Sequence, residues 1–304
     1  MHIVTFSTAD GNVWHPPRVG AELNSEYLLD FEGSFDGAKK PASHLAWLDT
    51  DGDGFQRARE KYEALTEDHS RIAPAFEAGW LVKRRDAYWR APVPRPGKLI
   101  CIGLNYRDHA AESKMAIPER PVVFSKFSSS VIAPGEPVIV PASSSQVDYE
   151  AELAVVIGRQ AKTVSADRAL DYVLGYTAVN DVSARDFQFA DGQWLRGKSC
   201  DTFAPMGPWI VTRDEIPDPH RLAIKLVLNG KKMQDSNTDQ LIFGVPALIE
   251  FLSETITLEP GDVIATGTPA GVGFARKPPV FLRPGDKMEV QIEGIGTLNN
   301  PIAA

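Results

Sequence analysis

Three carboxylates in the middle of the 304-residue chain have residue types and spacing that suit a metal site. Glu150 and Glu152 stand two residues apart in the segment 147–158, whose apolar and β-branched residues predict a strand. Side chains alternate along a strand, so both carboxylates point to one face. Adjacent carboxylates repel each other unless a cation separates them, and Mg²⁺, Mn²⁺ and Ca²⁺ favour oxygen ligands. Asp181, after the strand-like run 176–180, supplies a third oxygen.

An ordinary charged strand is the alternative, because Glu at positions i and i+2 is common on a solvated sheet face. The run 153–157 that follows is continuously apolar, which indicates a strand that enters a core. Carboxylates buried there need partners. The residues by themselves leave both interpretations open.

A second constellation combines an imidazole with a carboxylate. The segment 105–112 follows a strand predicted at 99–102, and as a short helix it places His109 and Glu112 three residues apart on one face. Such a pair can remove a proton from water or from a carbon acid. An exposed polar pair on a surface helix is the alternative. The polar segment 113–121, which contains two prolines, has the composition of a mobile lid and equally of a surface loop.

Three more polar residues follow along the chain. Arg185 can hold a substrate carboxylate in a bidentate fork, or pair with Asp186 on the surface. Lys198 stands between two apolar stretches and can stabilise a developing enolate, or be solvated. Thr268 belongs to a glycine-rich turn, 266–273, whose backbone N–H groups can bind a carboxylate. The glycine spacing of this turn fits neither a P-loop nor a dinucleotide-binding motif.

Composition excludes some classes of partner. The formal net charge of −8, without any Lys/Arg-rich run, argues against nucleic acid. No stretch approaches the roughly 20 apolar residues of a membrane span, and no signal-peptide pattern is present, so no membrane partner is expected. Cys101 and Cys200 form no disulfide framework, which favours a reducing compartment. We therefore expect a cytoplasmic protein.

The chain divides into two regions that differ in composition and in predicted secondary structure. Residues 1–90 are predicted to form a small N-terminal α+β accessory domain, and the Pro-rich segment 91–97 is predicted to be a linker. Residues 98–304 contain recurring strands and few helices, which predicts an α+β fold rather than a doubly wound one. The predicted helices are 55–65, 165–174 and 245–252, and the predicted strands are 3–6, 99–102, 121–124, 137–140, 153–157, 224–228, 263–265 and 288–292.

Taken together, the segments resemble the fumarylacetoacetate hydrolase family from Lys98 to about Ile302. The likeness is greatest to the branch of fumarylacetoacetate hydrolase domain-containing proteins that has a longer N-terminal region. It implies a β-rich roll of mixed sheets, usually found as a homodimer. The motifs are Gly-Leu-Asn-Tyr at 103–106 with Asp108 and His109, Val-Asp-Tyr-Glu-Ala-Glu-Leu at 147–153, Asn-Asp-Val-Ser-Ala-Arg-Asp at 180–186, Gly-Lys-Ser at 197–199 and Gly-Thr-Pro-Ala-Gly-Val-Gly at 267–273.

The resemblance also implies roles for site residues. Glu150, Glu152 and Asp181 would bind Mg²⁺ or Mn²⁺, with Ca²⁺ possible in a crystal. His109 and Glu112 would form a general-base dyad on a lid. Lys198 would assist catalysis, and the expected substrate contacts are Arg185, Gln188, Thr268 and Tyr106.

The principal functional hypothesis is a divalent-metal-dependent hydrolase that cleaves a C–C bond in a 2,4-diketo acid such as an acylpyruvate or fumarylpyruvate. His109 would deprotonate water, and the metal and Lys198 would stabilise the enolate. The alternatives on the same metal site are an oxaloacetate keto–enol tautomerase and an oxaloacetate decarboxylase. A 2-hydroxy-diene-dioate isomerase and a diketo-deoxy sugar acid hydrolase are further alternatives. All five metal and dyad residues are present, which argues against a non-catalytic binding protein.

Overall fold

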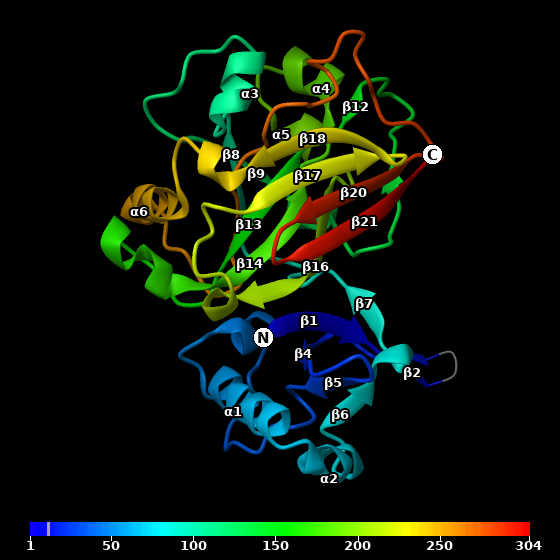
Figure 1. Cartoon of the computed structure of the whole chain (residues 1–304), viewed down its shortest axis with the longest axis vertical. Coiled ribbons are helices and arrows are strands. Elements are labelled where there is room, and N and C mark those ends of the chain that lie inside the picture. Colours follow the sequence, from blue (N-terminus) through cyan, green and yellow to red (C-terminus); the bar gives the residue numbers. More distant parts are fainter. Residues whose placement is uncertain (11–12) are drawn as a thin grey trace.

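A long twisted sheet of twelve strands runs through the molecule, and a second sheet of five strands packs against it (Figure 1). The computed structural model describes residues 1–10 and 13–304. Few helices accompany the strands, so the predicted β-rich α+β class is confirmed. In order across the long sheet, the strands are β6 (Leu81–Lys83), β5 (Tyr27–Asp30), β4 (Arg18–Glu22), β1 (His2–Ser7), β16 (Ala204–Thr212), β14 (Val173–Asn180), β13 (Ala151–Ile157), β19 (Val263–Ala265), β8 (Leu99–Gly103) and β9 (Val122–Lys126), with β7 (Tyr88–Arg90) on β1 and β10 (Val131–Ile132) on β16.

The smaller sheet closes the roll over one face of the long sheet. Along β13, Leu153, Val155 and Ile157 belong to the core shared with this second sheet, whereas Ala154 and Val156 belong to the core on the opposite face. All seven residues of β13 are buried, which confirms that this apolar run enters a core. The five strands in order are β11 (Val138–Ile139), β21 (Gly296–Ala303), β20 (Lys287–Ile292), β17 (Ala223–Leu228) and β18 (Lys231–Asn237).

The remaining elements are short. The helices predicted at 55–65 and 245–252 lie within α1 and α6, and the short helix predicted at 105–112 is observed as α3. Two small ribbons pair β12 (Val147–Asp148) with β15 (Ser183–Ala184) and β2 (Ala9–Asp10) with β3 (Val13–Trp14). The α-helices are α1 (Asp53–Glu67), α2 (Ile72–Glu77), α3 (Arg107–Glu112), α4 (Arg185–Ala190), α5 (Leu195–Lys198) and α6 (Val245–Thr255).

Two predicted elements were wrong in extent. The strand expected at 147–158 is interrupted at Tyr149 and Glu150, because the Tyr149 N–H donates to the Asp148 side chain and the Glu150 N–H donates to the Asn180 side chain. These side chains take donors that a sheet ladder would otherwise use. The helix expected at 165–174 is a 3₁₀-helix, Ala166–Tyr172, and its last predicted residues already belong to β14.

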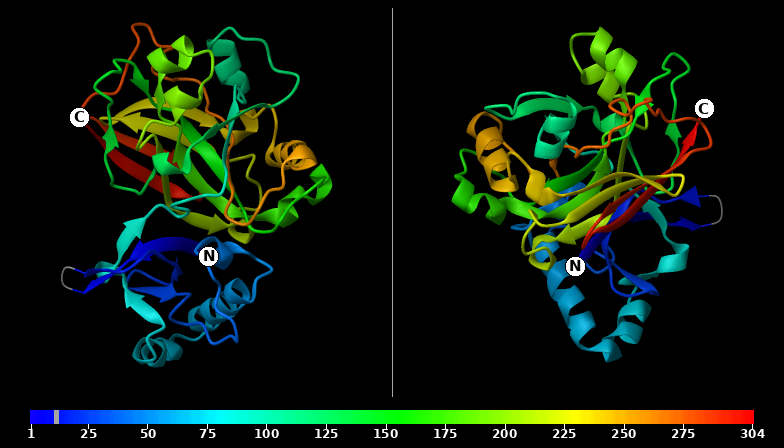
Figure 2. Two further views of the ribbon diagram at one scale, coloured as in Figure 1. Left: turned by 180° about the vertical axis from the view of Figure 1, so that it is seen from behind. Right: turned by 45° about the horizontal axis from the view of Figure 1, so that its top comes forward.

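The N-terminal part is joined to the rest of the chain through the long sheet. It occupies one end of the molecule in Figure 1 and in the rear view of Figure 2. β1 pairs antiparallel with β16, with Ile3 opposite Ile210. Ile3 and Leu29 share one buried cluster with Val156 and Ile210. The division into domains at 91–97 stays a prediction, and the structure adds that the sheet and the core cross it.

Within residues 1–10 and 13–304, no helix combines the length and apolarity that a membrane span requires.

Replacement of Ile3 tests the shared core. Ile3 is fully buried at the β1–β16 junction, so Ile3→Ala should lower the free energy of unfolding by roughly 2–5 kcal/mol. Ile117→Ala, at a side chain that is 57% exposed, is the control and should change it by less than about 0.5 kcal/mol. Urea unfolding followed by tryptophan fluorescence measures both. Two separate transitions, with Ile3→Ala shifting one alone, would contradict a cooperative core.

Candidate metal centre and active site

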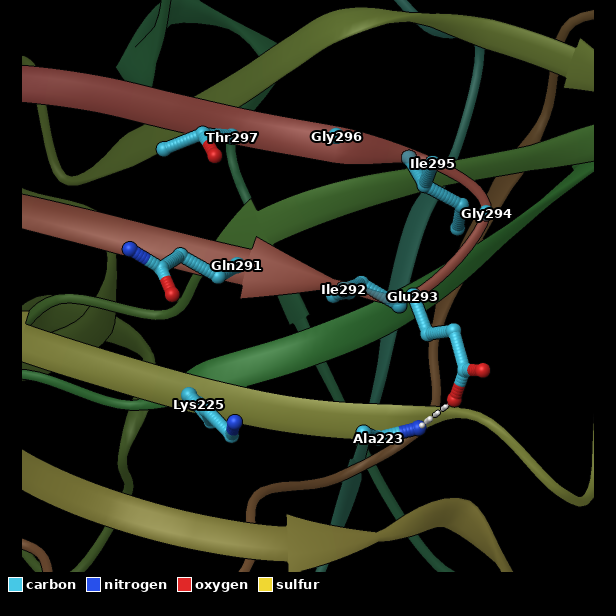
Figure 3. A pocket seen from close by; sticks show the side chains of 9 residues that line it. All are labelled: Ala223, Lys225, Gln291, Ile292, Glu293, Gly294, Ile295, Gly296 and Thr297. Carbon is cyan, nitrogen blue, oxygen red and sulfur yellow. Dashed lines mark hydrogen bonds between the residues drawn. The ribbon is translucent and has the colours of Figure 1, made fainter.

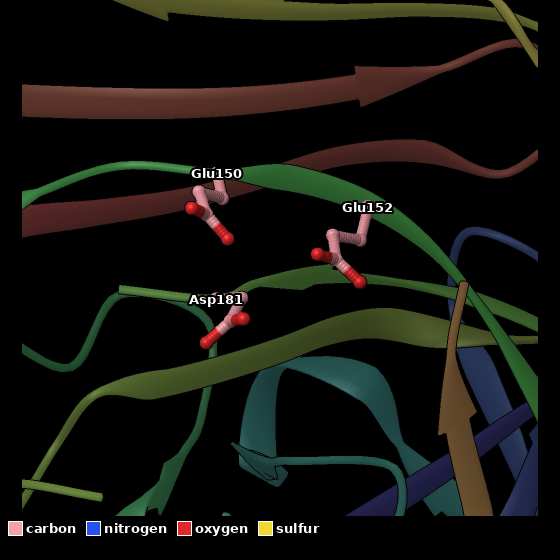
Figure 4. A group of neighbouring side chains, drawn as sticks. All are labelled: Glu150, Glu152 and Asp181. Atoms are coloured by element: carbon pink, nitrogen blue, oxygen red, sulfur yellow. The ribbon is translucent and has the colours of Figure 1, made fainter. Parts of the chain in front are cut away.

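Glu150, Glu152 and Asp181 converge inside the protein, as the sequence predicts (Figure 4). One carboxylate oxygen from each lies within 4.8 Å of the others. Pairing of β13 with β14 places Ala151 opposite Asn180, so the three acids lie at the adjacent ends of the two strands. Glu150 is 6% exposed and Glu152 is 1% exposed. The alternative of a charged strand on a solvated face is therefore wrong.

Two lysines on other elements donate hydrogen bonds to these carboxylates: Lys126 on β9 and Lys198 on α5. Lys198 Nζ donates to Glu150 Oε2 at 2.7 Å and to Asp181 Oδ2 at 2.6 Å. Lys126 Nζ, from β9, donates to Asp181 Oδ1 at 2.5 Å and to the Val182 carbonyl at 2.9 Å. Both ammonium groups are buried, so the alternative of a solvated Lys198 is wrong. The sequence analysis missed Lys126, although a lysine inside the largely apolar run 121–127 was a usable signal.

Charge balance sets the ionisation of Glu150 and Lys198. Burial by itself would raise the pKa of Glu150, but the charges of Lys198 and Arg185 outweigh burial and lower it. Burial would lower the pKa of Lys198, but Asp181 and Glu150 outweigh this effect and raise it. Glu150 is therefore an anion and Lys198 a cation at neutral pH.

Glu152 has the least compensation of the three acids. Burial, together with repulsion from Asp181 and Glu150, raises its pKa well above the usual range. The Gly267 N–H donates to Glu152 Oε2 at 2.8 Å, but this neutral donor does not balance the charge. With Asp148 included, four buried carboxylates face three buried cations, Lys126, Lys198 and Arg185. A hard dication coordinated by the three clustered acids would supply the missing positive charge beside Glu152, so the donor set fits Mg²⁺ or Mn²⁺.

Arg185 is fixed by the site itself. Its Nε donates to Asp148 Oδ2 at 2.9 Å, its Nη2 to Glu150 Oε1 at 2.6 Å and its Nη1 to Gln188 Oε1 at 2.9 Å. The guanidinium also lies 4.5 Å from the centre of the Phe274 ring. A surface pair between Arg185 and its neighbour was therefore a wrong alternative, because Arg185 is 3% exposed.

Asp148 joins this arginine to the glycine-rich turn, and the sequence analysis missed that role. Asp148 Oδ1 accepts from the Gly273 N–H at 2.7 Å, and Oδ2 accepts from the Phe274 N–H at 3.0 Å. These bonds span more than 120 positions along the chain, and Arg185 binds the same carboxylate. An aspartate two residues before the first metal-site glutamate was the available signal.

The predicted dyad is assembled on α3. His109 Nδ1 lies 3.5 Å from Glu112 Oε2, and His109 is buried. Both oxygens of Glu112 also lie within hydrogen-bond distance of the Gly271 N–H, at 3.1 and 3.0 Å. Burial raises the pKa of Glu112, but the nearby His109 and the Gly271 N–H outweigh burial, so the pKa is lowered. An ionised carboxylate therefore faces the imidazole at neutral pH.

Of the other predicted substrate contacts, Gln188 and Thr268 lie at the cavity and Tyr106 does not. Gln188 and Thr268 line the same cavity as the dyad histidine. Thr268 Oγ1 donates to the Ala151 carbonyl at 3.0 Å and accepts from Gln234 Nε2 at 2.8 Å, so its hydroxyl supports the strand. Tyr106 is fully buried and its hydroxyl has no hydrogen-bond partner; it does not line the cavity.

A cavity of about 140 Å³ lies beside the carboxylates. Its lining has a polar part and an apolar part, called here the polar wall and the apolar wall, and the polar wall contains seven of the ten predicted site residues. The polar wall is His109, Glu150, Glu152, Arg185, Gln188, Lys198 and Thr268 with Ser113, and the apolar wall is Ile102, Gly103, Leu104, Met115, Phe124, Phe189, Trp194 and Phe274.

A larger hollow, of about 690 Å³, lies over β17, β20 and β21 (Figure 3). Its ionisable lining residues are Lys225 and Glu293, and Glu293 Oε2 accepts from the Ala223 N–H at 3.0 Å. None of the predicted site residues line it. Among the described residues, the only group of three potential metal-ligating side chains is the one beside the smaller cavity. Size therefore does not identify the site, whereas the chemistry of the lining does.

The family model for the fumarylacetoacetate (FAA) hydrolase C-terminal domain matches residues 98–303. The chain belongs to the fumarylacetoacetate hydrolase family. It is 40% identical to a mitochondrial oxaloacetate tautomerase from Xenopus laevis, over 99% of this chain and 90% of that protein. Family membership makes the chain an enzyme, and the predicted family resemblance is confirmed.

Two solved structures of the family match almost the whole chain. The fumarylacetoacetate hydrolase from Exiguobacterium antarcticum is 34% identical, with a TM-score of 0.77 over 99% of both chains. The 2-hydroxyhepta-2,4-diene-1,7-dioate isomerase from Mycobacterium marinum is also 34% identical, with a TM-score of 0.72 over 100% of this chain and 98% of that one. Proteins with this fold therefore bear the names of different reactions.

Neutralisation of Glu152 tests the metal centre. Glu152→Gln keeps the side-chain shape and removes one ligand charge, so Mn²⁺ affinity measured by calorimetry should fall by at least about tenfold. Without metal the variant should unfold no more easily than the wild type, because the repulsion from Asp181 and Glu150 is relieved. Glu254→Gln, at an exposed position, is the matched control. Unchanged Mn²⁺ affinity in Glu152→Gln would contradict the assignment of this ligand.

Proposed function

We propose that this chain is a divalent-metal-dependent oxaloacetate keto–enol tautomerase. The observation that carries the proposal is a proton-transfer dyad beside three buried, clustered carboxylates at one small cavity. Likeness over 99% of the chain to a protein named as an oxaloacetate tautomerase favours this reaction over C–C bond hydrolysis.

Keto–enol exchange moves one proton between C3 and the oxygen on C2, and it breaks no C–C bond. His109 is the group that takes and returns this proton, and ionised Glu112 holds the imidazole and balances its positive charge. A divalent ion held by Glu150, Glu152 and Asp181 would act as a Lewis acid toward the substrate oxygens.

Positive charges that are already held in place lower the free energy of the enolate as it forms. Lys198 lines the cavity while its ammonium group is held between Glu150 and Asp181, so it does not reorganise during the reaction. Arg185 is fixed in the same way by Asp148 and Glu150. Phe124 lies against Lys198 and Phe274 lies against Arg185, and these apolar neighbours strengthen the field of the two charges.

Hydrolysis of an acylpyruvate is the second candidate. The ionised Glu112 beside His109 favours it, because this arrangement can also activate a water molecule. Decarboxylation of oxaloacetate needs no such base, so nothing in the dyad favours that reaction. Homodimer formation and a cytoplasmic location stay predictions.

Loss of the imidazole tests the proposed reaction. Freshly dissolved enol-oxaloacetate should lose its ultraviolet absorbance rapidly with wild-type enzyme and Mg²⁺, and chelation by EDTA should remove this activity. His109→Gln should lower kcat/KM by about 10²- to 10⁴-fold, because proton transfer then lacks its base. His69→Gln, at an exposed histidine, is the control and should leave the rate unchanged. A full rate in His109→Gln would remove the dyad from the mechanism.

Product analysis separates the two candidates. Wild-type enzyme given acetylpyruvate should leave the diketo acid intact if it is a tautomerase. Release of pyruvate and acetate, without acceleration of enol-oxaloacetate loss, would replace the tautomerase with a C–C bond hydrolase.

A further inference from the structure

One face of β9 leads from the carboxylates toward the surface. Side chains alternate along a strand, so Lys126, Phe124 and Val122 share a face at spacings of about 7 Å. Lys126 binds Asp181, Phe124 lines the cavity, and Val122 is 39% exposed. The inner end of this row is therefore charged, and its outer end is apolar.

The start of α5 forms a second row with the same order. The Lys198 N–H donates to the Trp194 carbonyl at 3.0 Å, which places the two side chains one helical turn apart on the same side. Lys198 reaches Glu150 and Asp181, and the half-buried Trp194 lies farther out. Both rows therefore lead outward from the carboxylates.

The aromatic residues of the two rows meet. The Phe124 and Trp194 rings pack edge to face, with centroids 5.4 Å apart, and Lys198 Nζ lies 5.1 Å from the Phe124 centroid. Gly103 lies directly behind the indole, because a methyl group built on Gly103 would lie 2.7 Å from a ring carbon of Trp194. The ring pair is thus held between α5 and the end of β8.

These two rings also separate two hollows. The inner one is the cavity of about 140 Å³ at the carboxylates. The outer one is a groove of about 370 Å³, and Phe124 and Trp194 are the two residues that line both. The groove is lined by Val122, Val123, Phe124, Ser125, Gly192, Gln193, Trp194 and Leu195.

We propose that Phe124 and Trp194 form a partition that sets substrate length, so that the cavity admits short 2-oxo acids and excludes longer tails from the outer groove. This inference deepens the proposed function and rests on its placement of the acid head at the carboxylates. Removal of the indole joins the cavity to the groove and gives a long tail an apolar path.

Binding to Mn²⁺-loaded protein tests the partition without requiring turnover. The probes are oxalate, which has the acid head and no tail, and the straight-chain series from 2-oxobutyrate to 2-oxooctanoate. Calorimetry gives the ratio of 2-oxooctanoate affinity to oxalate affinity for each protein. Trp194→Ala should raise this ratio by at least about tenfold, because several methylene groups gain apolar contacts in the groove. Leu195→Ala, which alters the groove alone, is the matched control and should leave the ratio unchanged.

Phe124→Leu opens the same partition from β9 and should shift the ratio in the same direction. An unchanged ratio in both variants, with oxalate still bound, would overturn the proposal. Loss of oxalate binding in both would also overturn it, because the rings would then be required by the head site rather than divide two spaces.

The two proposals fail separately. Absence of enol-oxaloacetate turnover by the wild type, with the ratio shifted in Trp194→Ala, would remove the tautomerase and leave the partition. Rapid turnover of enol-oxaloacetate by the wild type, with an unchanged affinity ratio in Trp194→Ala, would remove the partition and leave the tautomerase.

Discussion

Compensation of buried negative charge is the constraint on which the site depends. Four carboxylates lie where water is excluded, and uncompensated charges there would be very costly. The compensating groups come from separate elements: Lys126 from β9, Lys198 from α5 and Arg185 from α4. The cluster therefore forms only when these elements have packed on the ends of β13 and β14. Because one carboxylate remains without a cation, the same packing that completes the fold leaves a donor set that fits a divalent ion.

The sequence predicted those features that depend on local pattern. Alternation placed Glu150 and Glu152 together, and the apolar run after them predicted burial. The residues that were missed depend on long-range contacts. Lys126 lies 55 positions from Asp181, and Asp148 lies 125 positions from Gly273. The periodicity of a single element does not contain such pairings, although Lys126 interrupts a largely apolar run and Asp148 stands two residues before Glu150.

Errors in the predicted elements have the same origin. Propensity predicted one strand through Glu150, but the Asn180 side chain takes its N–H, so the ladder is interrupted where the acids are placed. The division predicted at 91–97 from the composition of its prolines stays a prediction. Composition did not indicate that β1 of the N-terminal part pairs with β16 and shares a buried core with it.

Control of water connects the two proposals. An enolate can be returned to the ketone by a proton from His109, or its precursor can be attacked by a water molecule that the same histidine activates. The dyad is compatible with both, so the supply of water decides between them. Phe124 and Phe274 line the cavity beside Lys198 and Arg185 and offer a water molecule no hydrogen bond from their side chains. The apolar part of the lining therefore reduces the surface at which an attacking water could bind, and this favours proton transfer through His109 over hydrolysis.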